Sequence, residues 1–265
     1  MNRTRVRVRR DSPSALAWAI ALVVTMLVVY LLTLDAARPD VVESVSAAPR
    51  VTREIAFEPI ERWCVSLCAC DSAEAARIQA SAYTSRGAAG FVTRVDDAWH
   101  VLGAAYETQR EAERVAGRLQ KDETIDAAAL CLAAEGVTLR ITAPERQIEA
   151  VAAADAMLRE QTRQLGEIAL QIDRNEIRPE AVRTLCALSA TEAAEAGKAL
   201  RDIPGASENR LCAALIERLE TLSGLLDAVA KTRETSGAAL SGMVRCAKIE
   251  NLVGQREFQA GLTKG

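Results

Sequence analysis

The feature that most constrains this chain is an uncharged, largely apolar stretch of about twenty residues at positions 15–34. At a rise of about 1.5 Å per residue, a helix of this length spans the roughly 30 Å hydrocarbon core of a bilayer. A cleaved secretory signal has a shorter apolar region of about 7–15 residues. The segment Leu34-Asp35-Ala36 is also a poor cleavage site. We therefore predict a retained transmembrane helix over residues 15–34.

The first ten residues contain no acidic residue and five arginines, at positions 3, 5, 7, 9 and 10. By the positive-inside rule, this cluster holds the N-terminus in the cytoplasm. We predict a cytoplasmic basic tail over residues 1–14 and an extracytoplasmic chain from Asp35 onward. The protein is then a single-pass cell-membrane protein, N-terminus inside, with the bulk of its chain outside the cytoplasm.

The charge balance limits the partners of the extracytoplasmic part. The whole chain carries a net charge of −3, and the five N-terminal arginines supply +5, so the remainder carries −8. Such an acidic part is a poor candidate for binding nucleic acid or other anionic polymers through bulk charge.

Aromatic residues make up only 3% of the chain and alanine is abundant, which favours helices over a β-sandwich.

Residues 35–58 contain prolines and no sustained periodicity, which indicates a linker. From Trp63 onward, apolar residues alternate with period two, which indicates a strand. The pattern then predicts a helix after Asp71-Ser72, strands over 90–95 and 98–106, a helix over 109–121 and a last strand near 128–133. This order, β-α-β-β-α-β, predicts an α+β fold of the split β-α-β (ferredoxin- or RNP-like) type. It has a four-stranded antiparallel sheet with both helices on one face and the other face free.

Three motifs in this region resemble the sporulation-related repeat (SPOR) domain of bacterial envelope proteins. They are Trp63-Cys-Val-Ser-Leu-Cys-Ala, Asp71-Ser-Ala-Glu-Ala-Ala-Arg and Trp99-His-Val-Leu-Gly-Ala-Ala-Tyr106 with the helix after it. The resemblance covers about residues 60–135, inside a predicted domain of 59–142. It implies non-enzymatic binding of peptidoglycan, at glycan strands stripped of their stem peptides at a division or sporulation septum.

The predicted glycan-binding face is the side of the sheet without helices. If Trp63, Val65 and Leu67 point toward the helices, the opposite face carries Cys64, Ser66, Cys68, His100 and Leu102. Sugar binding by such a face normally uses Gln and Arg side chains and an aromatic ring. Here Ser66 and Leu102 stand where the family tends to have Gln and Arg. Two alternatives therefore stay open: the face docks the chain's own helical region, or it binds a partner protein of the envelope.

The seven cysteines all follow the predicted anchor, and an odd count leaves at least one unpaired. Cys131 lies on the predicted last strand and is a candidate partner for Cys64 or Cys68. Cys186 and Cys212 flank the turn of a predicted helical hairpin and are candidates for a disulfide across it. For all of these cysteines, the common alternative to a disulfide is an inert buried thiol.

The spacing C-x3-C-x-C does not resemble a zinc knuckle, so we predict no metal and no cofactor. We also find no catalytic motif and predict no enzymatic activity.

Residues 143–265 are predicted to be helical, after a short strand over 136–142. Pro144 opens a helix whose apolar heptad is interrupted by Asp155 and Thr162. Two more helices follow, and their apolar stripes indicate a two- or three-helix hairpin or bundle, or less often a seam for a partner. The tail from Thr232 is more polar and is predicted to fray.

Overall fold

The computed structural model describes residues 49–123 and 125–263. The predicted cytoplasmic tail, the predicted transmembrane helix over 15–34 and most of the predicted linker lie outside these ranges. Within them, no helix combines the length and the apolar character that a membrane span requires.

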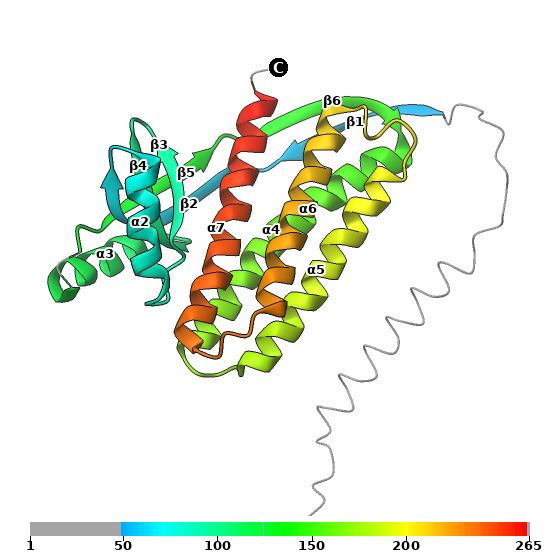
Figure 1. The fold of residues 1–265 in the computed structure, drawn as a ribbon. Coiled ribbons are helices and arrows are strands. Elements are labelled where there is room, and N and C mark those ends of the chain that lie inside the picture. Colours follow the sequence, from blue (N-terminus) through cyan, green and yellow to red (C-terminus); the bar gives the residue numbers. More distant parts are fainter. Residues whose placement is uncertain (1–48, 124, 264–265) are drawn as a thin grey trace, which may run out of the picture. The chain divides into compact units, whose positions relative to one another are not determined.

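The predicted α+β class is confirmed, because strands and helices each form in the order that the sequence indicates (Figure 1). The strands are β1 (Arg50–Phe57), β2 (Ile60–Cys70), β3 (Phe91–Val95), β4 (Ala98–Tyr106), β5 (Ala128–Ala134) and β6 (Val137–Pro144). The helices are α2 (Ala73–Thr84), α3 (Gln109–Glu123), α4 (Glu145–Asp173), α5 (Pro179–Arg201), α6 (Arg210–Lys231) and α7 (Gly237–Leu262).

The predicted four-stranded antiparallel sheet is also confirmed, with strand order β3-β4-β2-β5. The helices α2 and α3 pack on one face of it through small side chains, and Val65, Leu67 and Val101 of the sheet lie against them. Both helix starts are capped as the sequence indicates. Ser72 Oγ accepts from Ala75 N at 3.2 Å, and Thr108 Oγ1 accepts from Glu111 N at 3.3 Å.

The two central strands each contain one extra residue, and these residues face each other. Val65 pairs with Ala104, Ser66 with Leu102 and Cys68 with Val101, so Leu67 and Gly103 are left without a partner in the register. A Cβ on Gly103 would lie 3.0 Å from the Leu67 side chain, which explains the glycine. The extra residue in β2 turns Cys68 toward the core under α2 and α3. The predicted position of Cys68 on the opposite face is therefore wrong.

The strands β1 and β6 form a separate two-stranded ladder. They pair antiparallel and in register from Arg50 opposite Pro144 to Phe57 opposite Val137. The end of the predicted linker is thus a strand, and the short strand predicted over 136–142 is β6. The ladder places Ile55 and Phe57 in the core of the helical region, where the Phe57 ring meets Phe258 edge-on at 5.5 Å between centroids.

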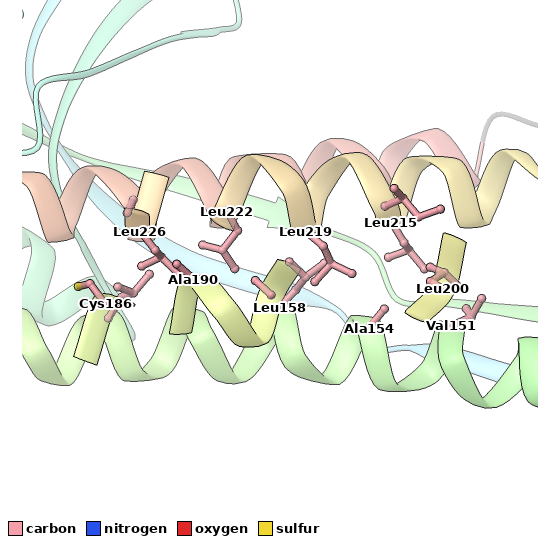
Figure 2. Close-up of a cluster of buried hydrophobic side chains, with 14 of the residues drawn as sticks. Val151, Ala154, Leu158, Cys186, Ala190, Leu200, Leu215, Leu219, Leu222 and Leu226 are labelled. Atoms are coloured by element: carbon pink, nitrogen blue, oxygen red, sulfur yellow. The ribbon is translucent and has the colours of Figure 1, made fainter. Parts of the chain in front are cut away.

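Four long helices, α4 to α7, form the bundle. Figure 2 shows leucines of α6 directed toward side chains of α4 and α5 in its core. The predicted fraying of the tail after Thr232 is wrong, because residues 237–262 form α7, with Ser236 Oγ as its N-cap acceptor. The apolar residues of α7 are divided between two faces, so neither face forms the long stripe that marked the other helices.

The helix α7 lies between the sheet and the other bundle helices (Figure 1). Leu240, Val244 and Ala247 belong to the core of the bundle. Ile249, Leu252 and Val253 belong to a second core with residues of the sheet. The prediction that one sheet face is free is therefore wrong, because the chain's own last helix covers it.

We expect Ile249→Ala to lower the free energy of unfolding by about 2–5 kcal/mol, since it leaves a cavity between α7 and the sheet. Because α7 contributes to both cores, sheet and bundle should still unfold in one transition. The measurement is chemical denaturation of the full chain, followed by tryptophan fluorescence for the sheet and circular dichroism for the helices.

The control is Leu188→Ala on α5, because this side chain is 58% exposed and its loss should change the free energy of unfolding by no more than about 0.5 kcal/mol. Two well-separated transitions in the unmodified chain would contradict the shared role of α7.

Candidate functional site

The five residues predicted to bind glycan do not form an open face. Cys64 and Leu102 are fully buried in the core between the sheet and α7. Ser66 is also buried, and Cys68 lies on the other side of the sheet. The open face predicted at these residues is therefore absent, and the chain's own helical region docks there through α7.

Ser66 and His100, two of the predicted site residues, are joined by a hydrogen bond. Ser66 Oγ lies 3.0 Å from His100 Nδ1 and donates to the Cys68 carbonyl at 3.1 Å. Since the hydroxyl has one proton to give, Nδ1 of His100 is the donor toward Ser66. This chain of hydrogen bonds joins β4 to the bulge in β2, so His100 has a structural partner.

All seven cysteines are free thiols. Cys131 stands opposite Trp63 in the register, while Cys64 stands opposite Leu130, so Cys131 and Cys64 point to different faces of the sheet. Cys186 and Cys212 are both buried and unbridged, and Cys212 Sγ accepts from Gln147 Nε2 at 3.2 Å. The disulfides considered from the sequence are therefore not formed.

Burial beneath α7 raises the pKa of the Cys64 thiol to about 12, against an opposing attraction from the Lys248 ammonium. At pH 8 the thiolate fraction of such a group is roughly 10⁻⁴, about a thousandfold below that of a thiol with a pKa near 9. We expect iodoacetamide to label the exposed Cys131 and to leave Cys64 unmodified until the chain is denatured. Mass spectrometry of the labelled peptides measures this, and labelling of Cys64 should rise with pH.

A Cys131→Ser variant serves as the control that assigns the fast-labelling peptide. Labelling of Cys64 as fast as Cys131 in the folded chain would contradict the closed interface between α7 and the sheet.

A groove of about 1300 Å³ lies among the described residues. Its lining comes from the end of β1, the end of β4, α3, α4 and α7. The first residues of β2 and the preceding turn close one end. The lining comes from segments that are far apart in the sequence, so no local motif indicates it.

Charged side chains dominate this groove, and most of them are paired. Ion pairs join Arg62 to Glu107 at 3.1 Å and Arg159 to Asp155 at 2.7 Å, and further pairs join Arg163 to Glu160 and Glu167 and Arg245 to Asp173. Arg114 and Arg118 of α3 also line the groove, and neither has an ion-pair partner among residues 49–123 and 125–263. The carboxylates of Glu58 and Glu111 line the groove as well, also without an ion pair in the described ranges, so guanidinium and carboxylate groups are mixed on its surface.

An aromatic ring and a buried ammonium complete the lining. Tyr106 is half-buried at the end of β4, and burial raises the pKa of its phenol, so it is neutral at physiological pH. Lys248 of α7 is only 8% exposed and donates to the Ala105 carbonyl at 3.0 Å. Burial lowers the pKa of Lys248, while the attraction of Glu107 opposes that shift.

The groove residues were not among the predicted site residues. The one local signal is Lys248 itself, a lysine set among small and apolar residues in the segment Cys246-Ala-Lys-Ile-Glu-Asn-Leu-Val253. A lysine at an apolar position of a helix is rarely buried without a reason.

Comparison with known proteins gives no match: no family model, no curated protein and no solved structure is similar enough to this chain to be significant.

Proposed function

We propose that this chain is a non-enzymatic, single-pass cell-membrane protein that binds denuded glycan strands of peptidoglycan outside the cytoplasm. The SPOR-like motifs and the apolar segment at 15–34 support the class of ligand and the location. The binding site that we propose is the groove beside α3 and α4. The sheet face is not proposed, because α7 covers it.

The observation that carries this proposal is the chemistry of the groove lining. Sugar sites combine an aromatic ring, on which a pyranose stacks, with planar polar groups that bind hydroxyl and acetamide groups. The residues predicted to bind glycan on the sheet face include no arginine or glutamine, and α7 covers that face, whereas the groove presents the Tyr106 ring together with the guanidinium groups of Arg114 and Arg118. Its volume of about 1300 Å³ exceeds the roughly 300–1,000 Å³ of small-molecule pockets, which favours an extended ligand.

The charge of the ligand fits the same lining. When an amidase removes a stem peptide, it hydrolyses the amide bond to the lactyl group and leaves a carboxylate on that sugar. A denuded strand is therefore a repeating anion. Since the chain beyond its first ten residues carries −8, bulk attraction cannot supply the affinity. Recognition must depend on local cations such as those on α3.

We expect the full chain in detergent to pellet with amidase-treated sacculi and to pellet more weakly with untreated ones. Arg118→Gln should weaken this binding about tenfold, because it removes one charge-assisted hydrogen bond from the groove. Both quantities come from the bound fraction at increasing sacculus concentration.

The matched control is Arg77→Gln, which removes an exposed arginine of α2 outside the groove. Equal pelleting with treated and untreated sacculi would contradict glycan recognition. An equal loss in both variants would show that the effect is one of overall charge.

A second candidate function is that of an envelope scaffold that binds a partner protein through its C-terminal helices. It is favoured by the outward face of α5, where Leu185 and Leu188 are 39% and 58% exposed among alanines and threonines. Arg183 donates to the carbonyls of Thr232 and Glu234, away from these leucines, and exposed Glu180 and Glu192 border them on either side. Neighbouring exposed leucines with a charged border are typical of a protein contact.

For this candidate we expect a photo-crosslinker at Thr184 to give a discrete protein adduct in cells that Leu188→Glu abolishes. Ile78→Glu should leave the adduct intact, since Ile78 is an equally exposed apolar residue on α2. Loss of the adduct in both variants, or no adduct at all, would contradict a partner site on α5.

A further inference from the structure

The buried ammonium of Lys248 lies where α7, α4 and β4 meet. The residue is 8% exposed, its Nζ donates to the Ala105 carbonyl at 3.0 Å, and it belongs to the lining of the groove. A lysine ammonium has three hydrogens to donate. Among the described residues, the Ala105 carbonyl is the only acceptor of a hydrogen bond from it.

The helix α4 leaves room for this ammonium. Gly166 of α4 faces Lys248, and a Cβ at that position would lie 2.8 Å from Nζ and 3.4 Å from Cε. Glycine in the middle of a helix is unfavourable because it loses more backbone entropy than alanine. A side chain at this position would displace the ammonium, so the glycine allows Nζ of Lys248 to lie directly against the backbone of α4.

The charge around Lys248 is not balanced. The cations that repel it are Arg62 and Arg245, and each of these has a carboxylate of its own, Glu107 and Asp173 respectively. Lys248 makes no ion pair with any residue of the described ranges, and the nearby Cys64 thiol is neutral. Three cations and two carboxylates leave one positive charge at this point of the groove. A buried charge without a partner is unfavourable, and such groups are concentrated at functional sites.

We infer that Lys248 is a carboxylate-binding subsite, in which the ammonium donates its remaining hydrogens to one carboxylate of a ligand lying in the groove. The single unbalanced charge fits a monoanion better than a dianion such as phosphate. That the carboxylate is the lactyl group of a denuded glycan strand rests on the proposed function. The subsite itself rests only on the geometry around Lys248 and Gly166.

The test uses the full chain in detergent and ligand-observed NMR with N-acetylmuramic acid as the probe. N-acetylglucosamine is the matched ligand, because it has the same ring and acetamide without the lactyl carboxylate. We expect N-acetylmuramic acid to bind at least tenfold more tightly. Acetate should compete with it, and inorganic phosphate should compete no better than acetate.

Two variants address the subsite in different ways. Lys248→Met keeps an unbranched side chain, one heavy atom shorter, and removes a buried charge, so it should fold and should abolish the preference for N-acetylmuramic acid. Gly166→Ala keeps the charge and fills the space, and it should reduce the preference at least tenfold. Gly224→Ala is the control, because a Cβ on that exposed glycine of α6 meets nothing within 4 Å.

The outcomes separate this inference from the proposed function. Equal binding of the two sugars by the unmodified chain, or tighter binding of phosphate than of acetate, overturns the carboxylate subsite. If the Lys248→Met variant still prefers amidase-treated sacculi as strongly as the unmodified chain, the subsite is wrong while the proposed function stands. If acetate binds through Lys248 but sacculi do not, the subsite stands and the ligand is not glycan.

Discussion

The packing of α7 on two sides is the interaction on which the rest of this structure depends. One helix supplies Leu240 and Val244 to the bundle and Ile249 and Leu252 to the sheet. The sheet and the bundle therefore share one element and cannot separate without exposing both cores. The helix α7 also contributes Lys248 and Leu252 to the lining of the groove. The packing of α7 on the sheet and on the bundle therefore also forms the groove.

Polar contacts fix where α7 lies along α4. Asn251 and Gln255 each donate to the Leu158 carbonyl, at 2.7 and 2.9 Å, and to Thr162 Oγ1, at 2.8 and 3.1 Å. Gln259 donates to the Glu58 carbonyl at 2.7 Å. Apolar side chains alone would tolerate a shift of α7 by one turn. Buried amides with specific acceptors do not, because a shift would leave them unsatisfied.

The sequence predicts the strands and helices between residues 60 and 135 well, because each has a clear period and a cap such as Ser72 or Thr108. It places Cys68 on the wrong face, since a period of two cannot reveal the extra residue at Leu67. It misses α7 because a helix that is apolar on two narrow faces has no single stripe. Thr162 was visible as a break in the α4 heptad, but its role as an acceptor depends on a helix about ninety positions later.

The candidate site was less predictable than the fold. The apolar character of the sheet face around Cys64 and Leu102 left docking of the chain's own helical region open as an alternative to the predicted glycan binding. The groove brings together Tyr106, Arg118, Gly166 and Lys248 from four elements, and only their meeting gives them a common chemistry. Information of this kind is absent from any single stretch of the sequence.

The ladder of β1 with β6 has a mechanical consequence. Any tension on the chain before Arg50 acts first on β1, whose partner β6 runs directly into α4. The residue pairs between β1 and β6 would resist that pull. At the end of β1, Phe57 is buried in the core and packs against Phe258. The β1–β6 ladder, and not α3 or the groove, is therefore the part of the described chain that such a pull reaches first.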